Sequence, residues 1–316
     1  MPEGVLVVDK PGGMTSHDVV AQARRLLGTR RVGHAGTLDP LATGVLVVLV
    51  GEATKLGPYL TADDKGYVAE VAFGRATDTL DAEGATTTSA AVPPWLREEM
   101  ARVDRPRLAA AFAAELARTE QVPPVFSAIH VDGRRSHDRA RAGEVVELAP
   151  RPVAVRRLEL IEGAVAADAA EPAIRLEVDV AKGYYVRSLA RDLGDRLGVP
   201  AHLAALRRTR SGAFRLDEAV RLDAGALALG AALIPVAAAI ARALPLGRLT
   251  AAGAGRARQG KRLGEADFVA LPPVADASAW LDPEGRLVAI GARTAGDSAT
   301  DPAMEGALTI HRGFVS

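Results

Sequence analysis

One short segment, GHAGTLDPLATG (residues 33–44), presents a single carboxylate, Asp39, among residues that bend the backbone. Its glycines can adopt backbone angles closed to other residues, and Pro40 keeps Asp39 out of the α conformation. A side chain held in this way can project into a cleft. The alternative is that Asp39 caps the following turn, and the segment taken alone favours that structural role.

Two other segments carry side chains that could work with this carboxylate. KGYYVRSLARDLG (182–194) predicts a strand end that turns into an amphipathic helix with Tyr185 and Arg187 at its start. An arginine there can pair bidentately with a nearby carboxylate and keep it ionised. Tyr67 enters a strand after Lys65-Gly66, although both tyrosines could equally be strand-end aromatics that cover a core.

The sequence lacks the motifs of several common enzyme classes. No G-x-G-x-x-G opens a helix, and G-x-x-x-x-G-K-[ST], H-E-x-x-H and G-x-S-x-G are absent. The chain has no cysteine, and the nearest two of its six histidines, His130 and His137, are seven residues apart. We therefore expect neither a cofactor nor a metal.

The elements that must position these residues alternate without a βαβ rhythm, which predicts an α+β fold. Val5–Val8 predicts a strand ended by a Pro-Gly-Gly turn, and Thr15 or Ser16 caps the helix that follows. Val45–Val50 is apolar on both faces, which indicates a central strand. Strands are also expected at 67–73 and 174–180, and a helix at 106–118.

Length and composition predict two globular domains. The chain has 316 residues, of which 48% are hydrophobic. Residues 1–244 form the predicted catalytic domain, and short strands with turn signals from about 245 to 316 predict a small β-rich domain. The uncharged stretch 224–241 is interrupted by Pro235 and predicts a buried helix and a turn rather than a membrane span. Without a signal peptide or cysteines, we expect a cytoplasmic protein.

The net charge is zero, with 39 basic and 39 acidic residues, but the charges are unevenly distributed. Residues 182–212 hold seven basic and two acidic side chains, whereas 63–83 are acidic. The arginine-rich segment 134–143 predicts either a mobile loop over a site or a solvated helix. Arginine count alone is weak support for RNA binding in a chain rich in arginine throughout.

Five segments together resemble the bacterial TruB family of tRNA pseudouridine-55 synthases. They run in the family's order from about Gly4 to Val220, roughly 70% of the chain: GVLVVDKPGGMTSHDVV, RRVGHAGTLDPLATGVLVVLVGEATKL, KGYVAEVAFGRATDTLDAEG, PPVFSAIHVDGRR and KGYYVRSLARDLGDRLGVPAHLAALRRTRSG. The resemblance implies a pseudouridine synthase fold with a mixed, mostly antiparallel central sheet. It also implies an RNA-gripping insertion at about 127–150 and a PUA-like C-terminal domain that contacts the acceptor stem.

The implied reaction isomerises one uridine in the T loop of tRNA without cofactor or metal, by a standalone monomer. The flipped uridine leaves its stack, its N-glycosidic bond breaks, and a bond between C5 and C1′ forms. The resemblance makes Asp39 the nucleophile, with either C1′ of the ribose or C6 of the base as its target. The seven basic residues in 182–212 then form a phosphate-facing surface around the pocket.

The resemblance also assigns the remaining site residues. Tyr67 stacks on the flipped base and is a candidate for removing the C5 proton, and Tyr185 lines the pocket beside Arg187, which pairs with the nucleophile. Leu206 packs beneath the base, His34 helps to hold the flipped nucleotide, and Lys10 supports the first motif.

The fourth motif departs from the family pattern, with Phe126, His130 and His137 at its Tyr, Lys and Tyr positions. These changes leave Asp39, Tyr67 and Arg187 untouched, so they do not put catalysis in doubt, but they could alter RNA grip. The alternatives are a guide-RNA-dependent synthase with protein partners, a tRNA-binding folding factor with incidental isomerase activity and, less favoured, a metabolic enzyme that uses Asp39 on a small molecule.

Overall fold

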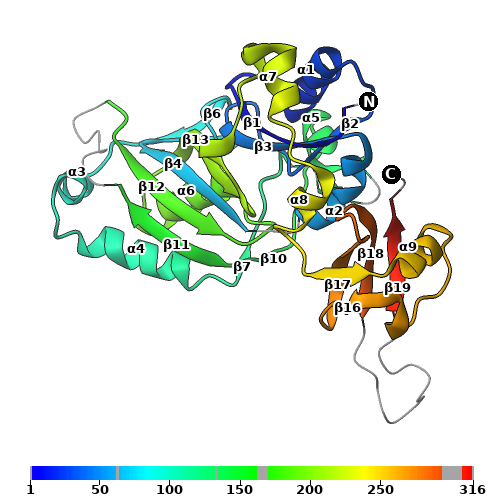
Figure 1. Ribbon diagram of the computed structural model, residues 1–316. Coiled ribbons are helices and arrows are strands. Elements are labelled where there is room, and N and C mark those ends of the chain that lie inside the picture. Colours follow the sequence, from blue (N-terminus) through cyan, green and yellow to red (C-terminus); the bar gives the residue numbers. More distant parts are fainter. Residues whose placement is uncertain are drawn as a thin grey trace, which may run out of the picture.

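The computed structural model describes residues 2–61, 64–127, 129–131, 134–161, 170–293 and 308–314. Its largest unit is an eight-stranded sheet with the order β1-β3-β13-β4-β12-β11, in which β2 pairs with β3 and β14 with β13 (Figure 1). Only β3 and β13 run parallel among these pairs. The predicted α+β class with a mixed, mostly antiparallel sheet is confirmed. The strands are β1 (Gly4–Lys10), β2 (Val32–Ala35), β3 (Thr43–Val50), β4 (Lys65–Phe73), β11 (Val155–Leu160), β12 (Ala173–Val180), β13 (Ala201–Ser211) and β14 (Phe214–Arg215).

Helices cover the sheet: α6 packs across β13 and β4, and α4 contacts both α6 and β11. The α-helices are α1 (Ser16–Leu27), α2 (Gly57–Leu60), α3 (Pro94–Ala101), α4 (Pro106–Leu116), α5 (Ser136–Arg141), α6 (Val186–Leu197), α7 (Gly225–Ala231), α8 (Val236–Ile240) and α9 (Ala251–Arg258). Short 3₁₀ turns are η1 (Gly51–Leu56), η2 (Leu216–Glu218), η3 (Leu222–Ala224) and η4 (Glu265–Asp267).

The start of α1 follows the sequence closely. The Thr15 hydroxyl accepts a hydrogen bond from the Asp18 N–H (3.1 Å), and the Asp18 carboxylate accepts one from the Thr15 N–H (2.8 Å). This reciprocal capping satisfies two backbone donors that would otherwise lack helical partners. Of the two caps considered from the sequence, Thr15 is the one used.

Three strand pairs lie outside the large sheet: β5 (Arg75–Thr77) with β6 (Thr86–Ser89), β7 (Glu120–Gln121) with β10 (Arg151–Pro152), and β8 (His130–Val131) with β9 (Arg134–Arg135). Within the arginine-rich segment 134–143, the backbone forms β9 and the short helix α5. The side chains of His130 and His137 lie outside the described part of the structure. The predicted RNA-gripping role of this insertion stays a prediction.

The uncharged stretch 224–241 is broken into α7 and α8 around Pro235, which precedes the first residue of α8. In the described ranges, no helix is long and apolar enough to span a bilayer. The predicted helix and turn are confirmed, but the expected burial is wrong for α7, where Leu229 is buried and Leu227 is 93% exposed.

A second sheet of five strands lies in the C-terminal part, in the order β16-β15-β17-β18-β19 (Figure 1). Its strands are β15 (Leu246–Leu249), β16 (Phe268–Ala270), β17 (Ala275–Leu281), β18 (Leu287–Arg293) and β19 (Leu308–Gly313). The expected β-rich tail is therefore present, with β15 beginning just after residue 245. The predicted division into domains 1–244 and 245–316 stays a prediction.

The strand pair β1 and β3 is buried on both faces because each face enters a different core. Leu6, Val8, Leu46 and Val48 join the core beneath α1 and α6. Val5, Val7, Val45, Val47 and Leu49 join a second core with side chains of the C-terminal sheet, among them Ala279, Leu281, Leu287, Ile290 and Phe314. The uninterrupted apolar sequence of β3 is the pattern such a strand requires.

Gly44 allows β13 to cross the start of β3 at close range. Its φ is +96°, and a Cβ there would collide with the backbone carbonyl of Arg208. Gly13 also has a positive φ, +79°, but a Cβ on it would meet no atom within 4 Å. Substitutions at these two glycines can therefore be compared to separate the cost of a strained φ from the cost of a steric clash.

We expect Gly44→Ala to destabilise the protein by about 3 kcal/mol or more, since the strain of a positive φ adds to overpacking against Arg208. Gly13→Ala should cost only about 1 kcal/mol, from strain alone. Urea unfolding of both variants beside the parent protein measures the difference. Equal losses in the two variants would contradict the close crossing.

Candidate active site

The loop that carries Asp39 connects β2 to β3 and is held by backbone contacts on both sides of Asp39. The Lys10 ammonium donates to the carbonyl of Pro40 (3.2 Å), and the Gly13 N–H donates to the same oxygen (2.9 Å). The Ser16 hydroxyl accepts from the Leu38 N–H (2.9 Å). The two residues that flank Asp39 are thereby fixed to the chain between β1 and α1, as the supporting role implied for Lys10 requires.

Lys10 is fully buried and also donates to the carbonyls of Pro11 (2.9 Å) and Met14 (2.6 Å). Burial lowers the pKa of its ammonium, and the negative charges of Asp39 and Glu83 oppose that shift. Its donors are directed at backbone carbonyls, so Lys10 is a support for the loop.

Asp39 pairs with Arg187, as the sequence predicted. The Arg187 Nε lies 2.9 Å from Oδ2, and Nη2 donates to Oδ1 at 3.3 Å. The first contact is a charge pairing without hydrogen-bond alignment, because the Nε–H finds no acceptor along its axis. The Asp39 side chain is 39% exposed and that of Arg187 only 7%, so solvent reaches the carboxylate and not the guanidinium.

Arg187 is surrounded by further acceptors from distant parts of the chain. It donates to the carbonyls of Thr79 (3.0 Å) and Phe126 (2.9 Å), and its Nε lies 3.7 Å from the buried carboxylate of Asp81. Because Phe126 contributes its backbone oxygen, the replacement of the family's tyrosine by phenylalanine leaves this contact intact. The guanidinium is oriented before any substrate arrives.

Asp81 is a site residue that the sequence reasoning did not single out. Its Oδ1 accepts from the Thr79 hydroxyl (2.6 Å) and the Glu83 N–H (3.1 Å), while Oδ2 faces Arg187. It lies within the third resembling segment, in the sequence TDTLDAEG, where several short polar residues signal a tight turn. That signal could have marked the turn, although not its contact with Arg187.

Tyr185 occupies the residue before the first turn of α6 and is held by Gln121. The Tyr185 N–H donates to Oε1 of Gln121 (2.9 Å), and Nε2 of Gln121 donates to the Tyr185 carbonyl (3.3 Å). Burial raises the pKa of the Tyr185 phenol, while a hydrogen bond to Ser127 opposes the shift. The buried Gln121 is a second residue that the sequence reasoning missed.

Tyr67 and Leu206 lie on the neighbouring strands β4 and β13 and belong to one apolar cluster. Both are nearly buried, at 9% and 8% exposure. Tyr67 is aligned with Arg208 on β13, and Arg208 with Gly44 on β3, so the three central strands bring Tyr67 to the edge of the Asp39 loop.

His34 lies on β2, just before the loop. Its ring meets that of His17 edge-on with centroids 5.5 Å apart. Burial, assisted by the charges of His17 and Arg208, lowers the pKa of its imidazole. The lowered pKa favours the neutral imidazole over the cation.

The basic stretch 182–212 differs from the expected phosphate-facing surface in several positions. Arg208 is buried, Arg207 pairs with Asp9 (2.8 Å) and Arg210 with Asp179 (2.6 Å). The side chains of Arg207 and Arg210 are 40% and 30% exposed, and their charges are already paired with carboxylates of the same sheet. The expectation is wrong for Arg208 and for Arg187, which are both buried.

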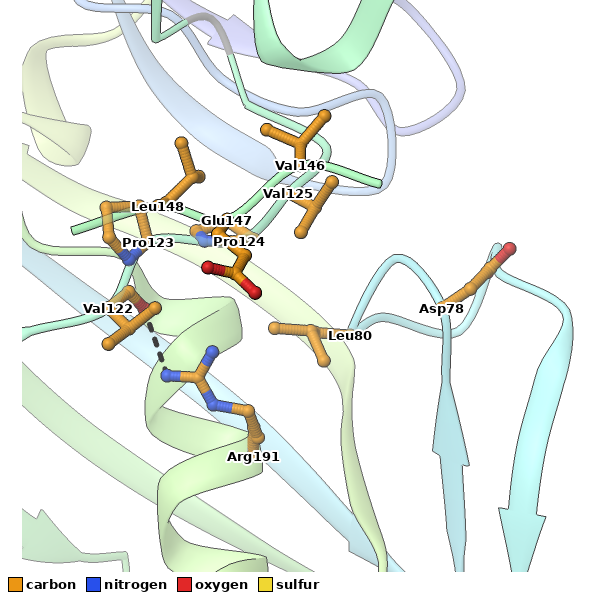
Figure 2. A pocket seen from close by; sticks show the side chains of 10 residues that line it. All are labelled: Asp78, Leu80, Val122, Pro123, Pro124, Val125, Val146, Glu147, Leu148 and Arg191. Atoms are coloured by element: carbon orange, nitrogen blue, oxygen red, sulfur yellow. Dashed lines mark hydrogen bonds between the residues drawn. The ribbon is translucent and has the colours of Figure 1, made fainter. Parts of the chain in front are cut away.

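A pocket of about 410 Å³ lies beside Arg191 of α6 (Figure 2). Arg191 is one helical turn further along α6 than Arg187. Leu80, the Val122–Val125 segment and residues 146–148 line it, and Arg191 donates to the Val122 carbonyl (3.0 Å) at its wall. The pocket adjoins the segment that supports Arg187 but does not contain Asp39, Tyr67 or Tyr185. Among the described residues, no group of histidine and acidic side chains could hold a metal ion.

Two family models match consecutive parts of the chain. "TruB family pseudouridylate synthase (N terminal domain)" matches residues 24–186, and "tRNA pseudouridylate synthase B C-terminal domain" matches residues 187–230. Proteins named tRNA pseudouridine synthase B include one from Thermobifida fusca, 47% identical over 83% of this chain and 87% of the relative. Another, from Nocardia farcinica, is 52% identical over 70% of this chain and 69% of the relative.

Solved structures agree in fold. The Cbf5 chain of a Cbf5-Nop10-Gar1 complex matches with a TM-score of 0.72 and 24% identity, over 99% of this chain and 85% of that chain. An archaeal box H/ACA Nop10-Cbf5 complex matches with a TM-score of 0.68 and 25% identity, over 99% and 86%. The match extends over the whole pseudouridine synthase architecture. With its sequence relatives and family models in agreement, the chain belongs to the TruB family of pseudouridylate synthases.

Proposed function

We propose that this protein converts one uridine, position 55 in the T loop of tRNA, to pseudouridine with Asp39 as the nucleophile. Formation of pseudouridine in tRNA follows from membership of the family and from identities of 47–52% to proteins named tRNA pseudouridine synthase B. The position of the uridine and the roles of individual residues are the proposed part. The observation that carries them is the half-exposed Asp39 carboxylate paired with a buried arginine.

In the proposed reaction the flipped uridine enters beside Asp39, and its unstacking is offset by stacking on Tyr67. Asp39 attacks C1′ or C6, the N1–C1′ bond breaks, and the rotated base rejoins the ribose through C5. The bond to Asp39 breaks again, which regenerates the carboxylate. The C5 proton leaves, with the phenolic oxygen of Tyr67 as the candidate acceptor, and N1 gains a proton. Arg187 aims Asp39, because its guanidinium lies against both carboxylate oxygens, with Nε 2.9 Å from Oδ2 and Nη2 3.3 Å from Oδ1.

Several side chains complete the proposed pocket. Tyr185 and Leu206 line it, and the neutral His34 contacts the flipped nucleotide while Lys10 supports the loop. Because hydrogen bonds hold these side chains in place before the substrate binds, the proposed pocket is preorganised and the uridine has to move into it. We propose no metal or cofactor for these steps.

The C-terminal sheet is proposed to contact the acceptor stem. The turn after helix α9 exposes Lys261 and Arg262, and no acidic residue occurs between residues 251 and 264. On α9 itself, Arg256 and Arg258 are exposed but are paired with Asp267 (3.5 Å) and Asp282 (2.6 Å). Such a basic run suits phosphate contacts without base recognition. We further propose that the protein acts as a monomer in the cytoplasm.

We expect the purified protein, without added metal, to release the C5 hydrogen of a single uridine from an unmodified tRNA transcript labelled with tritium at C5. Mapping of the modified position should identify uridine 55, and a transcript with cytidine there should release nothing. An isolated T-arm hairpin should react with a higher KM, because it lacks the acceptor stem. Absence of release from the full transcript would overturn the proposal.

The partner-dependent alternative is tested by the same measurement, since the protein is assayed alone. The curated relatives match at 47–52% identity, against 24–25% for the Cbf5 chains solved with Nop10 or with Nop10 and Gar1. This difference favours action without protein partners.

A further inference from the structure

The side chain of Arg208 is buried at the centre of the sheet, where a charge needs strong compensation. Only 1% of the residue is exposed, and in the described ranges no carboxylate forms an ion pair with it. Strand β13, which carries it, lies between β3 and β4 (Figure 1). Burying an unpaired cation is costly unless each donor finds an acceptor.

The acceptors are three backbone carbonyls at the two ends of the Asp39 loop. Nε donates to the carbonyl of Val45 (2.6 Å), Nη1 to that of Thr37 (3.2 Å) and Nη2 to that of Gly36 (3.1 Å). Gly36 and Thr37 lie on the incoming arm of the loop, and Val45 lies on the outgoing strand β3. One planar guanidinium therefore joins both arms.

The backbone of Arg208 also contacts the outgoing arm of the loop, in addition to the contact made by its side chain. Arg208 is aligned with Gly44 in the parallel pairing of β13 with β3, and Gly44 leaves no room for a side chain against the Arg208 carbonyl. Lys10, Gly13 and Ser16 bind the apex of the loop at Leu38 and Pro40. The Thr43 hydroxyl, on the outgoing arm alone, accepts from Arg207 and donates to the Leu206 carbonyl. The β2–β3 ladder joins the two arms as far as Ala35 and Val47. Beyond that ladder, among the described residues, Arg208 is the side chain that donates to both arms.

We propose that Arg208 is a positioning residue for catalysis: its guanidinium ties the two arms of the loop together and so fixes where Asp39 stands relative to Arg187. The inference rests on the proposed role of Asp39. A lysine cannot replace the fork, because a single ammonium cannot reach three carbonyls in fixed planar directions. Rotation or spreading of the arms would move the nucleophile, and misplacement by about 1 Å can cost about 100-fold in rate.

The test compares Arg208→Lys and Arg208→Met with Arg210→Met. Arg210 lies two residues further along β13, and its guanidinium pairs with Asp179 on β12 instead of the loop. Single-turnover pseudouridine formation and tRNA binding are measured for each variant. We expect both Arg208 variants to lose about 100-fold in rate while the Kd for tRNA stays within about 3-fold, with Arg210→Met close to the parent protein in both.

Hydrogen exchange provides a readout that does not need activity. Peptides from residues 33–43 should exchange faster in Arg208→Lys than in the parent protein and in Arg210→Met, whereas peptides from α6 should be unchanged. If Arg208→Met does not fold, the rate, tRNA affinity and hydrogen exchange of Arg208→Lys alone test the positioning role. Full activity in Arg208→Lys, or equal losses of rate and tRNA affinity, would overturn the positioning role. Inactivity of the parent protein would instead overturn the proposed function, and the exchange result would still test the bridge.

Discussion

Asp39→Asn is expected to abolish pseudouridine formation while tRNA binding is retained. Asparagine keeps the size of the side chain but has no anionic oxygen to attack a carbon atom. We expect the single-turnover rate to fall by about 10⁴-fold or more, as is typical when a nucleophile is removed. The Kd for tRNA should stay the same or fall, since the variant removes one negative charge from a surface that faces phosphates.

A matched variant, Asp217→Asn, removes a carboxylate from an exposed position, where the side chain is 77% exposed. It should leave the rate and the affinity unchanged. Pseudouridine formed at an undiminished rate by Asp39→Asn would contradict the nucleophile assignment. A cellular effect of the gene that survives in Asp39→Asn cells would instead support a tRNA-folding role separate from the isomerase.

Arg187→Ala should produce the second large effect, a loss of turnover that far exceeds any loss of tRNA affinity. Its partners are the carboxylates of Asp39 and Asp81 and the carbonyls of Thr79 and Phe126, all within the protein. We expect kcat to fall by about 10²- to 10³-fold, on the scale of losing one preorganised electrostatic contact. The Kd should change by less than about 3-fold, because no phosphate is lost as a partner.

Arg187→Ala should also lower the free energy of unfolding by about 3 kcal/mol, since the buried Asp81 would lose the cation that faces it. Arg187→Lys keeps a charge but loses the fork, so it should recover stability more than kcat. Arg191→Met, one turn further along α6, serves as the control for helix damage. Equal losses of kcat and tRNA affinity in Arg187→Ala would indicate that the side chain binds the RNA backbone.

The sequence was informative wherever local pattern and burial agree. The apolar run of β3 predicted a strand buried on both faces, and the polar start of α6 predicted Arg187 beside a carboxylate. The first prediction depends only on the apolar pattern within one strand, and the second depends only on one pair of opposite charges. The motif resemblance then linked Asp39 to Arg187 across 148 residues, which spacing alone could not do.

The sequence was less informative where a polar residue is buried by distant segments. Leu206-Arg207-Arg208 reads as part of a basic surface, yet β13 is the central strand and Arg208 is buried within it. Asp81 and Gln121 likewise resemble ordinary turn and strand residues. Their importance depends on which backbone groups face them, and this is fixed only when the sheet closes.

The position of β13 also determines the order in which the protein can mature during synthesis. Residues 201–211 join two groups of strands, β1-β2-β3 and β4-β12-β11, that have no hydrogen-bonded pair with one another in the sheet. A nascent chain that has emerged only to residue 200 lacks the strand that unites them and the guanidinium beneath the Asp39 loop. Sheets closed by such distant pairings form slowly. Competence for catalysis should therefore wait until β13 has emerged, although Asp39 leaves the ribosome well before it.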